Sequence, residues 1–155
     1  AYQIRGFVRA QAGDLEGAIV DLRHFCELKE DAQDYPRLFL FVFRSQLGET
    51  DAARTELADY LKDRWTKDPK EWVGVIGDFL ISKIEEKELF SAVHSNDSKV
   101  ERSRRCEASY FAGIIHLLDG DKKNAADYFR KCIATEMSNF SEFRLARVEL
   151  KRLEK

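Results

Sequence analysis

Apolar residues recur at helical spacing along most of this chain, in amphipathic stretches that alternate with short polar segments. The pattern lacks the many tight turns of a β-sandwich, because the sequence has only 2 prolines and 8 glycines. It predicts helices over 72–81, 85–93, 99–118 and about 139–153. The chain is therefore predicted to be all-α.

Three short segments repeat one pattern, in which a glycine is followed by an acidic residue and, five residues after the glycine, by an alanine. They begin at Gly13, Gly48 and Gly120, which are separated by 35 and 72 residues. A glycine ends a helix easily because it adopts the left-handed conformation, and the acid after it is expected to cap the next helix. Each segment therefore predicts a helix, a tight turn and a second helix.

The interval between Gly48 and Gly120 is long enough for one further, degenerate unit. Asp68-Pro69 is expected to start its first helix, and Lys83 stands roughly where the turn glycine would be. We expect Ser138, Asn139 or Ser141 to cap the last helix. The predicted units are 1–32, 34–66, 68–95 and 99–136, followed by a capping helix at about 139–153.

Small and large apolar residues recur at fixed places in these units. The small residues stand on first helices (Gly6, Gly113) and second helices (Ala18, Ala53, Ala125), and large ones follow four residues after each alanine (Leu22, Leu57, Phe129). With these residues the chain resembles the tetratricopeptide repeat (TPR) family over nearly its whole length. Phe41, in place of a small residue, and the third unit depart from the family pattern.

The tract 106–113, together with Gly120-Asp121, Ala126, Phe129 and Asn139-Phe140, is similar to the last repeat and cap of a bacterial TPR branch that includes adaptor lipoproteins of the outer membrane. The resemblance implies a right-handed superhelical array of about four helix-turn-helix units plus a C-terminal capping helix. It also implies a single repeat domain over 1–155 whose concave groove binds a partner protein. The first predicted helix begins without a capping residue, so we expect further chain upstream of it.

In such an array the first helices line the groove. By the repeat alignment the inward positions are Gln3, Phe7, Gln11, Tyr35, Leu38, Phe39, Val42, Gln46, Lys70, Val73, Gly77, Glu107, Tyr110, Ile114 and Leu117. The residues predicted to bind a partner are Phe7, Gln11, Tyr35, Leu38, Phe39, Val42, Gln46, Tyr110 and Ile114. Their aromatic and aliphatic character suits an apolar peptide or an amphipathic helix. The alternative is that they pack against adjacent helices or against further repeats.

No pattern for catalysis, metal binding or cofactor binding is recognisable. His24, His94 and His116 fall in three different units without metal-ligand spacing, and His116 is expected to be a satisfied, partly buried side chain. No glycine-rich phosphate loop is present. We therefore expect a non-catalytic protein–protein interaction scaffold or adaptor without a cofactor. The alternative is a regulatory or substrate-recruiting segment of a larger enzyme or cell-envelope complex.

The balance of charge and the length of the apolar runs exclude some classes of partner. Lys and Arg total 26 against 28 Asp and Glu in 155 residues, a net charge of -2, which argues against nucleic-acid binding. The longest apolar run, Leu38 to Phe43, is too short to insert into a membrane. The run is predicted to be buried between helices, and the alternative is a surface for homo-oligomerisation. We therefore expect the partner to be a protein or a peptide.

The odd number of cysteines, Cys26, Cys106 and Cys132, favours a reducing, cytoplasmic compartment, and an envelope-attached location is the alternative. Cys106 and Cys132 stand at similar distances from Gly120. We therefore expect them to lie near each other as buried, reduced thiols.

A basic cluster precedes Cys106. Lys99, Arg102, Arg104 and Arg105 are interleaved with Glu101 and Glu107. The cluster is predicted to be a solvated helix face with internal ion pairs, and phosphate binding is the alternative.

Overall fold

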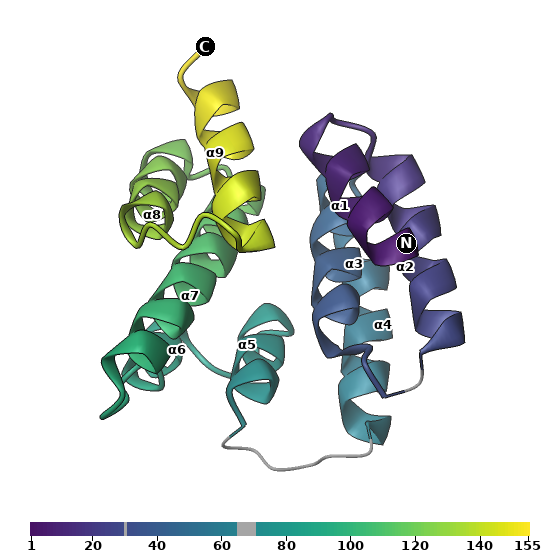
Figure 1. The fold of residues 1–155 in the computed structure, drawn as a ribbon, viewed down its shortest axis with the longest axis horizontal. Coiled ribbons are helices and arrows are strands. Elements are labelled where there is room, and N and C mark those ends of the chain that lie inside the picture. Colours follow the sequence, from purple (N-terminus) through teal and green to yellow (C-terminus); the bar gives the residue numbers. More distant parts are fainter. Residues whose placement is uncertain (30, 65–70) are drawn as a thin grey trace. The chain divides into compact units, whose positions relative to one another are not determined.

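The computed structural model describes residues 1–29, 31–64 and 71–155, and within them it contains helices and no strand (Figure 1). The all-α prediction is therefore confirmed for this part of the chain. Asp68, Pro69 and Lys70 lie outside the described residues. The helices are α1 (Tyr2–Gln11), α2 (Leu15–Leu28), α3 (Asp34–Gln46), α4 (Thr50–Asp63), α5 (Trp72–Leu80), α6 (Glu86–Ser91), α7 (Ser98–Leu118), α8 (Lys122–Ala134) and α9 (Ser141–Leu153).

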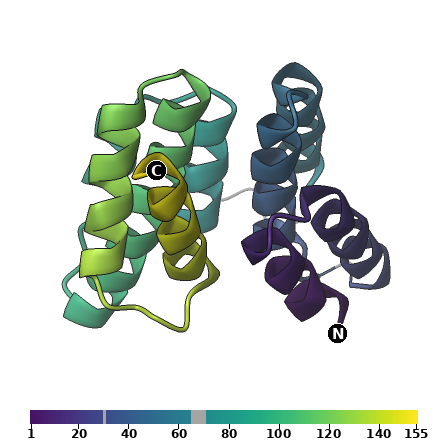
Figure 2. The ribbon, with the colours of Figure 1, turned by 90° about the horizontal axis from the view of Figure 1, so that it is seen from above.

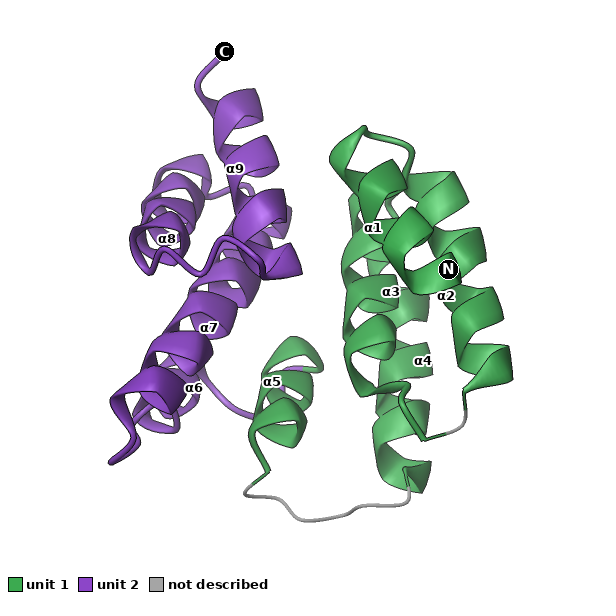
Figure 3. Cartoon of the chain, in the orientation of Figure 1, with its two compact units in different colours: residues 1–81 green, residues 82–155 purple. Residues whose placement is uncertain are grey.

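The chain divides into two compact units, unit 1 over Ala1–Ile81 and unit 2 over Ser82–Lys155 (Figure 3). Helices α1 and α2 pack together, as do α3 and α4 in unit 1 and α7 and α8 in unit 2. These pairs coincide with the predicted units 1–32, 34–66 and 99–136. The division falls inside the predicted unit 68–95, because α5 belongs to unit 1 and α6 to unit 2. A single repeat domain over 1–155 stays a prediction.

The three repeated glycines make the turns that their spacing predicts. The φ angles of Gly13, Gly48 and Gly120 are +91°, +91° and +81°, in the left-handed region that side chains disfavour. Between α5 and α6 this conformation is adopted by Ser82, with φ of +68°, and not by Lys83, the residue expected there. The prediction was therefore one residue late at the degenerate turn.

The predicted acidic caps form at two of the three turns. The Asp14 carboxylate accepts a hydrogen bond from the backbone N–H of Gly17 at 2.9 Å, and Asp121 accepts one from Asn124 at 3.2 Å. Glu49 makes no capping bond; its carboxylate pairs with Arg44 at 3.1 Å. The longer glutamate side chain favours this ion pair over the cap. At α9 the N-cap residue is Phe140, so the expected caps at Ser138, Asn139 or Ser141 were wrong.

Small residues permit close packing within two hairpins. A Cβ at Gly6 would lie 3.3 Å from Leu22, and a Cβ at Gly113 would lie 2.6 Å from the ring of Phe129. A side chain at Gly113 would therefore require the Phe129 ring or one of the two helices to shift. At both places a glycine on the first helix of the hairpin thus lies against a large apolar residue on the second.

The apolar run on α3 is core. Every residue from Leu38 to Phe43 is at most 1% exposed, which confirms the burial interpretation. Helix α3 packs against α2, α4 and α5, so its whole circumference is covered.

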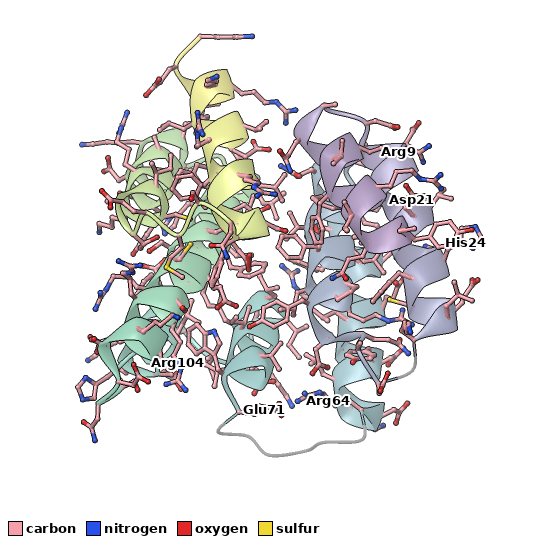
Figure 4. All side chains as sticks on the ribbon, in the orientation of Figure 1. Arg9, Asp21, His24, Arg64, Glu71 and Arg104 are labelled. Atoms are coloured by element: carbon pink, nitrogen blue, oxygen red, sulfur yellow. The ribbon has the colours of Figure 1, made fainter. Side chains whose placement is uncertain are left out.

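A buried carboxylate joins α1 to α2. The Asp21 side chain is fully buried, and Arg5 donates to both of its oxygens at 2.9 and 2.7 Å. Arg9 adds an ion pair at 3.2 Å, and Figure 4 shows its position beside Asp21. The hydrogen bond from Arg5 holds the pKa of Asp21 below its usual range despite the burial.

Helix α9 covers the α7–α8 hairpin in unit 2, as the predicted capping helix should (Figures 1 and 2). Its side chains Phe143, Leu145 and Ala146 are buried, whereas Arg144, Arg147 and Lys151 are exposed. The amphipathic pattern of 139–153 therefore places its apolar side against the other helices of unit 2.

Candidate functional site

Five of the nine residues predicted to bind a partner are core residues. The side chains of Leu38, Phe39, Val42, Tyr110 and Ile114 are at most 1% exposed. The ring of Phe39 meets that of Phe7 edge-on at 4.8 Å, and the ring of Tyr110 lies 5.1 Å from that of Phe111. These five side chains pack inside the protein, which is the alternative that the sequence left open. Replacing any of them would change the stability of the fold as well as any effect on binding.

The other four, Phe7, Gln11, Tyr35 and Gln46, are partly exposed. Of these, Tyr35 lines a pocket of about 460 Å³ in unit 1, which we call the aromatic pocket. Gln3 and Val73, also predicted to face the groove, line the same pocket. The full lining is Gln3, Phe25, Ala32, Asp34, Tyr35, Pro36, Glu71, Trp72 and Val73.

An ion-pair network holds one wall of the aromatic pocket. The guanidinium of Arg64 lies 2.6 Å from Asp34 and 3.2 Å from Glu71 (Figure 4). Arg64 donates two hydrogen bonds to Asp34 and the Tyr60 hydroxyl donates a third, and burial together with this third bond raises the pKa of Tyr60. One arginine thus ties the start of α3 to the segment entering α5. Two carboxylates share it, so the described residues of this wall carry an excess of negative charge.

A second pocket, of about 510 Å³, lies in unit 2 on the α7–α8 hairpin. We call it the basic pocket; its lining is Phe90, Arg102, Arg105, Ser109, Tyr128, Lys131, Ala134 and Thr135. The residues at 102, 105 and 109 repeat at helical spacing on α7, and those at 128, 131 and 135 do so along α8 and its C-cap. Two facing stripes therefore form the pocket.

The predicted ion pairs of the basic cluster form only in part. Arg105 pairs with Glu101 at 3.4 Å, and Glu101 also contacts His94 at 3.0 Å. The guanidinium of Arg104 donates to the backbone carbonyls of Ala92 and His94. Arg102 pairs with no acidic residue in the described part of the chain.

The three histidine side chains do not lie together in one site. His116 lies 2.8 Å from Glu86 and 3.1 Å from Asp121, which confirms that it is a satisfied, partly buried side chain. His24 lies near Glu27 at 3.5 Å and His94 near Glu101. Among the described residues no three His, Cys, Asp or Glu side chains are grouped for metal binding.

The three cysteines are expected to react slowly with a thiol reagent in the native protein. Cys106 and Cys132 lie 3.6 Å apart between their sulfur atoms, without a disulfide and fully buried, as their distances from Gly120 predict. The hydrogen bond between the two thiols lowers the pKa of Cys106 and, together with burial, raises that of Cys132, and burial raises the pKa of Cys26. All three thiols are buried, which limits access of the reagent. Ellman titration should therefore count the thiols only after denaturation. Rapid native labelling, or a disulfide found by mass spectrometry, would contradict this expectation.

The chain matches no protein-family model. The resemblance to the TPR family therefore stays a prediction drawn from residues. In the described part of the chain, no helix combines the length and apolar character needed to cross a bilayer.

Sequence reasoning missed most of the basic pocket. The cluster at 99–105 pointed to Arg102 and Arg105, but Phe90, Tyr128 and Lys131 come from α6 and α8. The distances from Gly120 place α8 beside α7 but do not show which of its side chains join Arg102 and Arg105 in one pocket, and no spacing places α6 there. The signal that was available is the short predicted helix at 85–93, which leaves part of a longer neighbour uncovered.

Proposed function

We propose that this chain is a non-catalytic scaffold, a TPR-like right-handed array of hairpins that binds a peptide segment of a partner protein in the aromatic pocket. The observation that carries the proposal is the origin of the pocket. Gln3 on α1, Tyr35 on α3 and Val73 on α5 all line it. These are the first helices of three consecutive predicted units, the helices expected to line a ligand groove.

The chemistry of the pocket indicates the kind of peptide. Phe25, Tyr35 and Trp72 supply aromatic surface, and Pro36 and Val73 supply aliphatic surface. Such pockets accept the apolar anchor residues that dominate peptide affinity. We therefore expect an aromatic or aliphatic anchor side chain.

The charge on the wall formed by Asp34 and Glu71 indicates a second property of the peptide. Among the described residues, the ion pairs of Asp34 and Glu71 both go to the guanidinium of Arg64, so one negative charge is left over there. A basic residue next to the anchor would complement it. The proposed ligand is thus an apolar anchor flanked by Lys or Arg.

Selection of peptides from a displayed random library on the immobilised protein tests this function. Binding of a selected peptide, measured by fluorescence anisotropy, should weaken about tenfold or more in Tyr35→Ala, because a central aromatic contact is lost. Tyr35→Phe keeps the ring and should bind nearly as the native chain does.

The matched control is Leu47→Ala, an exposed apolar residue that follows the other end of α3 and is not part of the pocket. It should leave the affinity unchanged. Selected peptides that bind Tyr35→Ala as tightly as the native chain would show that the aromatic pocket is not the binding site.

A further inference from the structure

The basic pocket exists because α6 is too short to cover the α7–α8 hairpin. Helix α6 spans only Glu86–Ser91 and reaches the half of the hairpin near Gly120. There Glu86 accepts hydrogen bonds from Tyr128 at 2.7 Å and meets His116 at 2.8 Å, and the ring of Phe90 stacks on Tyr128 at 5.5 Å. The basic pocket lies beside this contact, on the part of the hairpin farther from Gly120.

The basic pocket carries positive charge that the described residues neutralise only in part. Arg102, Arg105 and Lys131 line it, and no acidic residue does. Arg105 has a surface ion pair to Glu101, a weak kind of interaction, while Arg102 and Lys131 form no ion pair with any residue in the described ranges. The Lys131 ammonium lies 4.8 Å above the ring of Tyr128, which keeps it at the pocket wall.

A buried hydroxyl group without a partner belongs to the same pocket. Ser109 is 1% exposed, and its Oγ forms no hydrogen bond to the described residues. A buried hydroxyl group without a hydrogen bond destabilises the folded protein. Its presence in a pocket lining therefore indicates a ligand that forms the missing hydrogen bond. The Thr135 hydroxyl, which donates to the carbonyl of Cys132 at 2.6 Å, stands in the same lining and has lone pairs to spare.

We propose that the basic pocket binds a phosphate monoester carried on a compact apolar or aromatic group. Two guanidinium groups and one ammonium group offer more donors than the two oxygens of a carboxylate can use, whereas a phosphate offers three oxygens and nearly two charges. Phe90, Tyr128 and Ala134 supply apolar surface for the carrier. The chain as a whole has a net charge of -2, which fits a small ligand better than a nucleic-acid backbone.

Isothermal titration of the intact chain with phenyl phosphate, inorganic phosphate and benzoate at low ionic strength tests the site. Phenyl phosphate should bind with one-to-one stoichiometry and more tightly than benzoate. The affinity should fall about tenfold in Arg102→Gln and in Lys131→Gln, as expected for loss of a charge-assisted hydrogen bond. Ser109→Ala should also weaken binding without lowering the melting temperature, a combination that a purely structural serine would not give.

Matched controls come from the same unit. Lys123→Gln, exposed on α8, and Arg147→Gln, exposed on α9, remove equal charge away from the pocket and should leave the affinity unchanged. Inorganic phosphate that binds as tightly as phenyl phosphate would support the phosphate site and identify the source as the free ion. Equal losses in the controls, benzoate that matches phenyl phosphate, or no binding of either phosphate would overturn the proposal.

Discussion

Deleting residues 141–155 should unfold unit 2 or make the protein aggregate. Helix α9 contributes the buried side chains Phe143, Leu145 and Ala146, and it packs against both α7 and α8. Burial of each large apolar side chain is worth about 1.5–3 kcal/mol, and a whole domain is stable by only about 5–15 kcal/mol. Losing this helix also exposes its apolar partners on the hairpin. The expected loss is therefore comparable with the total stability of the unit.

Circular dichroism melts and size-exclusion chromatography measure this outcome. Neither tryptophan of the chain lies in residues 82–155, and Trp72 lies in α5 of unit 1, so changes in its emission follow unit 1 while circular dichroism follows both units. Deleting only Glu154 and Lys155 is the control, because it removes exposed residues and the surface pair of Glu154 with Arg130. A protein without residues 141–155 that stays monomeric and melts unchanged would show that α9 is an appendage.

The turns of this fold could be predicted from the sequence because their cause is local. Gly13, Gly48 and Gly120 adopt the left-handed conformation where their spacing placed it. Ser82 could not be predicted as the fourth such residue, because neighbouring structure and not its own preference sets its conformation. Glu49 also had a local alternative, the ion pair with Arg44, that the repeat pattern does not reveal.

For the residues predicted to line the groove, the sequence indicated only which face of each helix they occupy. Periodicity indicates which side of α3 or α7 is apolar, but it does not say whether another helix covers that side. Tyr35 stands at the start of α3 and remains in a pocket, whereas Phe39, one turn later, is covered. This difference depends on tertiary packing, so the repeat pattern assigned both residues the same role.

The basic pocket depends on helix length and on side chains from three helices. The sequence placed Arg102 and Arg105 in a charged cluster, and it predicted the short helix that leaves them uncovered. It did not place Lys131 beside them, because that proximity follows from how α8 packs back on α7 after the turn at Gly120. The residue pattern of α7 therefore predicted part of the pocket, whereas the packing of α6, α7 and α8 against one another could not be predicted from the sequence.

Replacing Glu142 by Gln is expected to stabilise the protein at neutral and mildly alkaline pH. Glu142 is 5% exposed, and it forms no ion pair within the described residues. Burial, together with the neighbouring carboxylate of Glu107, raises its pKa well above the ordinary value of 4.5, and a hydrogen bond to its own backbone offsets this only in part. The carboxylate is therefore an unfavourable buried charge whenever the pH exceeds its raised pKa.

The sign of the pH dependence follows from proton binding. Because the pKa of Glu142 is higher in the folded than in the unfolded state, folding takes up a proton. Its contribution to stability is complete below the ordinary pKa of a glutamate and is lost as the pH rises through the raised pKa. An amide side chain at this position carries no charge at any pH, so Glu142→Gln should remove this loss. The expected gain is about 1–3 kcal/mol on the alkaline side, the cost of an unsatisfied buried polar or charged group.

Urea unfolding of both proteins at about pH 5 and about pH 8 measures the difference. The free energies of unfolding should approach each other at the lower pH and diverge in favour of Glu142→Gln at the higher one. Asp21 and Asp121, whose pKa values are lowered by their hydrogen bonds, are ionised throughout this pH range and contribute equally to both proteins. Glu88→Gln, on an exposed residue, is the control and should show no such divergence. A variant less stable than the native chain at pH 8 would mean that the ionised Glu142 is stabilised by its surroundings, contrary to the burial argument.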